Sequence, residues 1–226
     1  LAWDPDGPQP SVPGPNTRAG ADALHDAQAA LRSRNFEAAI RAATAAMRNA
    51  RLPASRLALA YRIRGTALLN LREAEPARAD FESSLAIEPG DLYGQFGRGV
   101  ALNALGRPGE ALADFERVLA RLREPSIYYA RGMAHLKLHN LPAAAADFDA
   151  ALALQPRYAP AYYGRGLVHH ARGQAIRARD DYERALTIDP GFVNAREALK
   201  ALQARRAPPP EGRVRCAAGH GLRGGA

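Results

Sequence analysis

Cysteine, lysine and aromatic residues are all scarce in this sequence of 226 residues. The one cysteine, Cys216, excludes an internal disulfide framework and is compatible with either redox compartment. Aromatic residues make up only 7% of the chain, so the core must be built mainly from smaller side chains, of which alanine is abundant. Lys137 and Lys200 are the only lysines, so 29 of the 31 basic residues are arginine.

Long apolar runs are also missing, and no stretch of 18 or more residues could cross a membrane as a helix. Glycine and proline recur between short apolar stretches, a pattern that favours short helices over strands. We therefore expect an all-α protein.

Both ends of the chain lack helical periodicity. Residues 1–19 are rich in proline and glycine, and we expect a disordered lead or linker there. The start at Leu1 fits either the removal of an export signal or a chain cut from a longer protein. The compartment stays open, with an exported or periplasmic protein slightly favoured over a cytoplasmic one. Residues 207–226, behind the helix-stopping Pro208 to Pro210, are expected to form a disordered basic tail.

A repeat of 33 or 34 residues dominates the middle of the chain. Its marker is an Arg-Gly pair, with glycine at positions 65, 99, 132 and 166. Alanine follows each glycine after twelve residues, an aromatic residue four later and leucine four after that. The alanines are Ala77, Ala111, Ala144 and Ala178; the aromatic residues are Phe81, Phe115, Phe148 and Tyr182; the leucines are Leu85, Leu119, Leu152 and Leu186. Three copies close with proline, at Pro89, Pro156 and Pro190.

This pattern resembles the consensus of the tetratricopeptide-repeat (TPR) family. In that register the clear repeats are 58–91, 92–124, 125–158 and 159–192, and a degenerate copy fits 20–53, with Ala27 for the glycine and Ala43 for the aromatic residue. The resemblance implies a right-handed superhelical solenoid of antiparallel helix pairs over 20–206. Residues 193–206 have an amphipathic spacing suited to a C-terminal capping helix. Ala54 to Leu57 are extra residues, which we expect to lengthen the next helix by a turn.

The repeat positions also have a physical interpretation. Glycine or alanine at positions 8 and 20 lets two antiparallel helices approach closely, while the aromatic residue at position 24 fills the space towards the neighbouring repeat. One departure from the consensus is the arginine at position 7, which has an aspartate sixteen residues later in four repeats. Two interpretations stay open: a structural Arg-Asp ladder, which we favour because half-buried arginines need partners, and a basic row for an acidic ligand.

TPR proteins bind partners in a concave groove lined by positions 2, 5, 9, 12 and 13 of the first helix of each repeat. Carried over to matching positions, this predicts a groove of Arg62, Thr66, Leu69, Asn70, Phe96, Val100, Asn103, Tyr129, Met133, Lys137, Tyr163, Leu167 and His170. No repeat has the lysine and asparagine pairing by which chaperone-binding TPR proteins hold a carboxylate. The aromatic residues at position 5 either face a ligand or pack between adjacent helices, and both interpretations stay open.

No catalytic or metal-binding arrangement is recognisable. The glycines follow no strand as a phosphate loop would, there is no nucleophile elbow, and the histidines at 135, 139, 169 and 170 lack a zinc-ligand spacing. We expect no cofactor and no enzyme activity, but a scaffold or adaptor that binds a partner protein or peptide. The alternative is non-specific nucleic-acid binding through the arginine-rich tail, since residues 205–226 carry half of the formal charge of +8. The sequence does not identify the partner, the pathway or the oligomeric state.

Overall fold

The computed structural model describes residues 15–48 and 52–204, and for residues 15–18 it describes the backbone alone. This part of the chain consists of eleven α-helices and contains no strand, which confirms the all-α prediction. The helices are α1 (Pro15–Arg32), α2 (Phe36–Met47), α3 (Ala54–Asn70), α4 (Ala74–Ile87), α5 (Leu92–Ala104), α6 (Pro108–Leu119), α7 (Pro125–Lys137), α8 (Leu141–Leu154), α9 (Ala159–Ala171), α10 (Ala175–Ile188) and α11 (Val193–Ala204).

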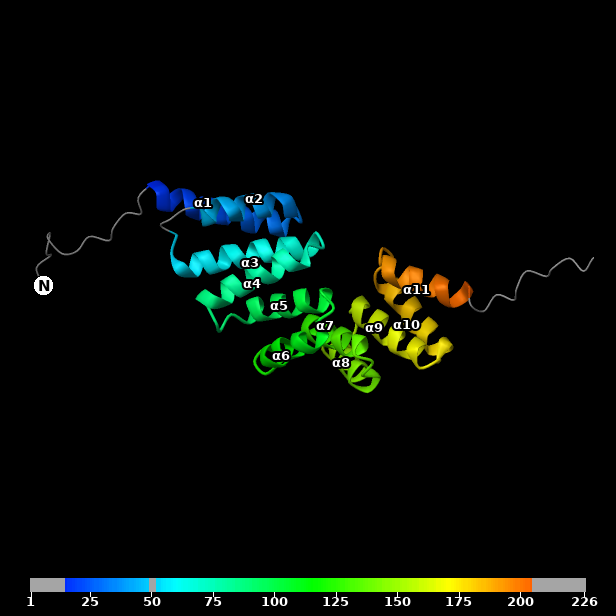
Figure 1. Cartoon of the computed structure of the whole chain (residues 1–226). Coiled ribbons are helices and arrows are strands. Elements are labelled where there is room, and N and C mark those ends of the chain that lie inside the picture. The colour runs from blue at the N-terminus through cyan, green and yellow to red at the C-terminus, as the bar shows by residue number, and fades with distance from the viewer. Residues whose placement is uncertain (1–14, 49–51, 205–226) are drawn as a thin grey trace, which may run out of the picture.

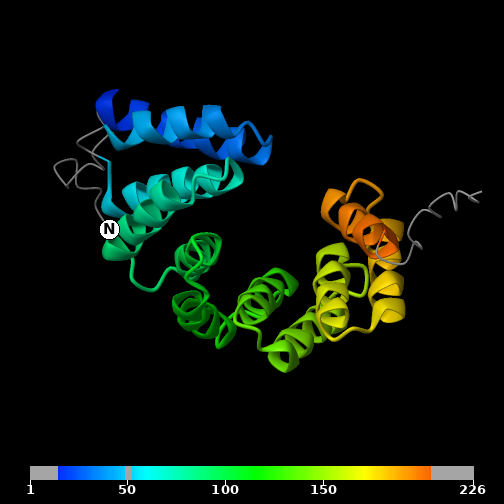
Figure 2. The same cartoon turned by 45° about the vertical axis from the view of Figure 1, so that its right-hand side comes forward.

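The helices form five antiparallel hairpins that stack in chain order into a right-handed solenoid, and α11 packs on the last hairpin (Figure 1). Each hairpin contacts the next through its second helix, and the first helices of neighbouring hairpins also contact one another. Figure 2 shows the resulting arch, with α5, α7 and α9 along its inner side and α6, α8 and α10 along its outer side. The first helices of the hairpins therefore line the concave face.

Helix boundaries correct one prediction and confirm another. The expected lead over 1–19 extends too far, because α1 begins at Pro15. Proline is well tolerated in the first turn of a helix, where its missing N–H group has no partner to lose. The rest of the lead and the tail from 205 onward lie outside the described residues. As predicted, α3 is a turn longer than its counterparts, with 17 residues against 13 in α5, α7 and α9.

The core confirms the role assigned to the repeated aromatic residue. The Phe148 ring is fully buried between two glycines, Gly132 of its own hairpin and Gly164 of the next. A methyl group at Gly164 would lie 2.4 Å from this ring, and one at Gly132 would lie 2.8 Å from it. Phe81 occupies the same place between Gly65 and Gly97 in the earlier hairpins. The glycines thus make room for a ring that ties each repeat to its neighbour.

The Arg-Asp ladder is present as a structural feature. In each of four hairpins the arginine donates two hydrogen bonds to a buried aspartate, through Nε and Nη2, at 2.6 to 2.9 Å. The pairs are Arg64–Asp80, Arg98–Asp114, Arg131–Asp147 and Arg165–Asp181. These hydrogen bonds raise the pKa of the arginines above the ordinary value. The interpretation of these arginines as a free basic row is therefore wrong.

Two ladder arginines also reach the preceding hairpin. Arg64 donates to the Thr44 hydroxyl at 3.3 Å, and Arg165 donates to the Asp149 carboxylate at 2.8 Å. The ladder consequently links hairpins as well as the two helices within each one.

The turn inside each hairpin is the same in all five copies. The residue at repeat position 15 has a positive φ of 57 to 77°, and only two of the five are glycine. They are Arg34, Arg72, Gly106, His139 and Gly173. A left-handed residue commonly ends a helix, and here it returns the chain into the second helix. In the described part of the chain, no helix combines the length and apolar character that a membrane crossing requires.

Candidate partner-binding groove

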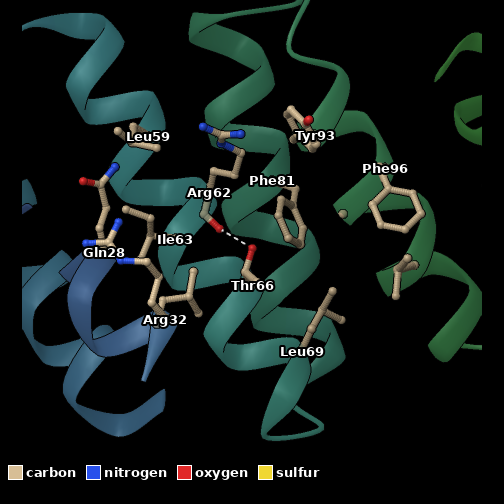
Figure 3. A pocket seen from close by; sticks show the side chains of 13 residues that line it. Gln28, Arg32, Leu59, Arg62, Ile63, Thr66, Leu69, Phe81, Tyr93 and Phe96 are labelled. Carbon is tan, nitrogen blue, oxygen red and sulfur yellow. Dashed lines mark hydrogen bonds between the residues drawn. The ribbon is translucent and has the colours of Figure 1, made fainter. Parts of the chain in front are cut away.

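The concave face holds a well-defined cavity near its N-terminal end, between α1, α3 and α5 (Figure 3). The cavity has a volume of about 450 Å³ and is lined mainly by apolar side chains. Leu59, Ile63 and Leu69 come from α3, while the rings of Phe81 and Phe96 face the same space from α4 and α5. The remaining lining residues are Gln28, Leu31, Arg32, Arg62, Thr66, Tyr93, Gly97 and Val100.

Charge at the cavity has one sign, because two of the thirteen lining residues are arginines and none is acidic. Arg62 is placed by Asp91, with 3.4 Å between Nε and Oδ2, and its guanidinium lies 5.6 Å from the centre of the Tyr93 ring. Arg32 lies in the last turn of α1 and is exposed. The Tyr93 side chain stands at the rim, 53% exposed.

The cavity lies where the second hairpin lacks the aromatic residue that the later hairpins have at position 5. In the third, fourth and fifth hairpins, an aromatic residue at position 5 packs against the aromatic residue at position 24, with ring centres 6.0 to 6.1 Å apart. The pairs are Phe96–Phe115, Tyr129–Phe148 and Tyr163–Tyr182. In the second hairpin, position 5 is Arg62. Phe81, at position 24, therefore lacks the packed ring that its counterparts have. Phe81 therefore forms part of the cavity wall.

The C-terminal half of the groove is filled by its own aromatic side chains. Besides their partners within the hairpin, Tyr129 packs edge-on to Tyr158 at 6.2 Å, and Tyr163 packs edge-on to Phe192 at 5.4 Å. Burial raises the pKa of the Tyr129 phenol well above its ordinary value, and burial likewise raises the pKa of Tyr163. Both rings are half-buried and pack within the stack, as one interpretation of position 5 predicted. That their exposed parts face a ligand stays a prediction.

The structure brings five of the predicted groove residues together around the cavity: Arg62, Thr66, Leu69, Phe96 and Val100. Others are spread along the concave face. Met133 packs near Phe148, and Leu167 packs near Tyr182. His170 is half-buried on α9.

The polar members of the predicted groove are partly engaged with the backbone. Asn70 donates to the carbonyl of Thr66 at 2.9 Å. Lys137 donates from Nζ to the carbonyl of Asn103 on the neighbouring inner helix. The Oδ1 atom of Asn103 is buried and has no hydrogen-bond partner among the described residues.

Several lining residues were not predicted although the position rule covers them. Gln28, Leu31 and Arg32 occupy positions 9, 12 and 13 of the degenerate first repeat, to which the rule was not applied. Leu59 and Tyr93 occupy position 2 of the second and third repeats. Applying the same five positions to every repeat would have identified all five residues.

Two of the histidines lie beside the aspartates of ladder pairs. His135 lies 4.0 Å from Asp147 and His169 lies 3.7 Å from Asp181, each beside a ladder pair. His169 also makes a 2.7 Å contact through Nδ1 with Gln174. Among the residues that the structure describes, no three His, Cys, Asp or Glu side chains gather as a metal site would require.

Comparison with known structures supports the fold. The crystal structure of YrrB is 21% identical over 82% of this chain and 98% of that one, with a TM-score of 0.59. TTC0263 from Thermus thermophilus is 19% identical over 82% and 100%, with a TM-score of 0.68. MamA from Desulfovibrio magneticus RS-1 is 19% identical over 80% and 98%, with a TM-score of 0.63. No curated protein sequence matches the chain.

The family comparison is more specific than these likenesses. A tetratricopeptide-repeat model matches residues 64–126 and again residues 129–191, together more than half of the chain. The two matches fall on the four clear repeats, whose glycines, aromatic residues and hairpins are described above. The chain therefore belongs to the tetratricopeptide-repeat family.

Proposed function

We propose that the chain is a protein-interaction scaffold that binds a peptide or a protein segment along its concave groove, without catalysis of its own. The observation that carries the proposal is the cavity of about 450 Å³ between α1, α3 and α5. Its size falls within the range of ligand-binding clefts, and its largely apolar wall with a few polar groups is typical of such sites. YrrB, whose fold is similar, is described as having an unusual peptide-binding site.

The rest of the groove supports an extended contact rather than a single small ligand. Tyr129 and Tyr163 expose part of their rings on successive inner helices, with Met133 and Leu167 nearby. Half-buried rings held by neighbours offer contact area at little cost in conformational entropy. A peptide lying along α3, α5, α7 and α9 would meet the cavity first and these rings afterwards.

Site-specific photo-crosslinking tests the proposal. Benzoylphenylalanine is placed at position 100, 133 or 167 on the inner helices, or at position 41, 117 or 179 on the outer helices as matched controls. The full chain is irradiated in extracts of its source cells. We expect the same protein partner to be cross-linked from the inner positions and not from the outer ones. Cross-linking from outer positions alone would contradict the proposal.

The nucleic-acid alternative depends on residues 205–226, which lie outside the described part of the chain. Removing these residues separates the two functions. A scaffold keeps its cross-links from the inner helices after the removal. A non-specific nucleic-acid binder loses binding to unrelated RNA and DNA, and that binding weakens steeply with salt.

A further inference from the structure

We propose that the cavity between α1, α3 and α5 is an anchoring site for an acidic peptide, in which one bulky apolar side chain enters the cavity and an adjacent carboxylate binds Arg62, while Arg32 adds a second positive charge at the cavity. The inference rests on the proposed function and specifies its ligand. Asp91, which already holds Arg62, tunes the affinity for that carboxylate.

The shape and the apolar lining of the cavity favour a bulky apolar side chain of the peptide. Leu59 and Ile63 lie on one side of the cavity, and Leu69 lies with the rings of Phe81 and Phe96 on the other side (Figure 3). A volume of about 450 Å³ accommodates an aromatic side chain together with part of its backbone. Burial of such a side chain removes apolar surface from water on both partners, which is the main source of affinity at a site of this kind.

The charge of the cavity selects the carboxylate. Arg32 and Arg62 are the charged lining residues, and they have the same sign. The ladder arginines differ from them, because each ladder arginine is held by two hydrogen bonds of 2.6 to 2.9 Å to its aspartate. Arg62 has a looser partner, at 3.4 Å from Asp91. Its guanidinium is therefore able to bind a second carboxylate.

Asp91 has two separable roles. One carboxylate oxygen accepts a hydrogen bond from the Tyr93 backbone N–H at 3.1 Å and so caps the start of α5. The other oxygen faces Arg62. Asparagine caps helices about as well as aspartate does, so Asp91→Asn keeps the cap and removes only the negative charge. The substitution should make Arg62 a better partner for an incoming carboxylate.

Three small probes test the proposal on the full chain. N-acetylphenylalanine carries both the apolar side chain and the carboxylate, its amide lacks the charge, and N-acetylglycine lacks the side chain. Binding is measured as shifts in ¹H–¹⁵N spectra during titration. We expect N-acetylphenylalanine to move signals of α3 and α5 and to bind at least ~5-fold more tightly than its amide, while N-acetylglycine leaves the spectrum unchanged.

Variants then assign the effect to residues. Arg32→Gln with Arg62→Gln should abolish the preference for the acid over the amide, whereas Arg41→Gln, an exposed arginine on the outer helix α2, should leave it intact. Asp91→Asn should tighten binding of the acid by about 3-fold and leave binding of the amide unchanged. Circular dichroism spectra of all variants establish that the helices are retained.

Several outcomes would overturn the proposal. Equal affinity for acid and amide in the wild type would remove the role of the arginines, and shifts confined to α7 and α9 would place the anchor elsewhere. A change in the emission of Trp3, the only tryptophan, on replacing the two arginines without any probe would show that the chain's own first residues occupy the cavity. Cross-links from positions 133 and 167 that persist after these results would leave the general scaffold function standing.

Discussion

The two halves of the concave groove are built from the same repeat positions and yet differ in what they leave open. In the half formed by α7 and α9, Tyr129 and Tyr163 cover the buried aromatic residue of their own hairpin. In the half formed by α1, α3 and α5, Phe96 covers Phe115 in the same way, but Arg62 occupies the equivalent position on α3 and a cavity remains. The residue at position 5 thus distinguishes a hairpin whose buried aromatic residue is covered by a ring from one whose aromatic residue lines a cavity. We therefore expect the half formed by α7 and α9, the sealed half, to contribute more to stability, and we propose that the half with the cavity binds the partner.

What the halves share is equally informative. The Arg-Asp ladder continues through both, with pairs of the same geometry in the second to fifth hairpins. The first hairpin has Asp26 and Ala42 at these positions and receives only the hydrogen bond from Arg64 to Thr44. The ladder thus links the two helices of a hairpin in both halves and does not distinguish the half with the cavity from the sealed half.

The largest expected effect on the free energy of unfolding comes from removing a packed ring in the sealed half. Tyr163→Ala removes a ring that packs on both Tyr182 and Phe192, so we expect it to lower the free energy of unfolding by about 3 kcal/mol. Tyr93→Ala, at the exposed rim of the cavity, should cost under about 1 kcal/mol. Urea denaturation followed by circular dichroism measures both. Similar losses for the two variants would mean that the halves do not differ in this way.

A second prediction tests what the halves have in common. Double-mutant cycles on Arg98 with Asp114 and on Arg131 with Asp147 should each give a coupling free energy of roughly 0.5 to 3 kcal/mol. Within each pair, replacing the arginine by alanine should cost more than replacing the aspartate, because the aspartate is buried and would be left unpaired. A coupling close to zero in either half would contradict a continuous ladder.

The sequence predicted those features that repeat. The aspartate in step with each arginine predicted the ladder, and the spacing of glycine and aromatic residues predicted the hairpins and the packing of Phe148. The cavity was harder to predict because it depends on a departure from the pattern, namely Arg62 at position 5. It also draws Gln28, Leu31 and Arg32 from a first repeat that matches the consensus poorly. The depth of a groove depends on the size of the side chains that line it. A repeat consensus does not specify these side chains.

A third prediction concerns a substitution that gives the half with the cavity the covering ring of the sealed half. Arg62→Phe places a ring over Phe81, as Phe96 lies over Phe115, and should close the cavity. We expect a gain in unfolding free energy of up to about 1 kcal/mol from the added apolar contact, together with loss of N-acetylphenylalanine binding. Arg56→Phe, at an exposed position earlier on α3, is the matched control and should keep the binding. Unchanged binding in Arg62→Phe would place the ligand outside this cavity.

The smallest expected effect on stability at neutral pH concerns Tyr182 in the sealed half. The fifth hairpin has Tyr182 where the other clear repeats have phenylalanine, and its buried hydroxyl has no hydrogen-bond partner among the described residues. Burial, with smaller contributions from Tyr163 and Asp181, raises the pKa of this phenol to about 12. Tyr182→Phe removes an unpaired polar group, so it should stabilise the protein by about 0.5 to 1 kcal/mol at pH 7.

The sign of the pH dependence follows from the raised pKa of Tyr182. Below pH 10, the ordinary pKa of tyrosine, the phenol is protonated in both the folded and the unfolded chain, so the advantage of Tyr182→Phe stays constant with pH. Between pH 10 and about 12 the unfolded chain loses the Tyr182 proton while the folded chain keeps it, and the wild type is destabilised. The advantage of the variant should therefore widen across this window in urea titrations at pH 9, 10 and 11. If the stability advantage of Tyr182→Phe shrinks as the pH rises, the folded chain favours the ionised phenol. The sealed half would then hold a charge that its apolar packing is expected to exclude.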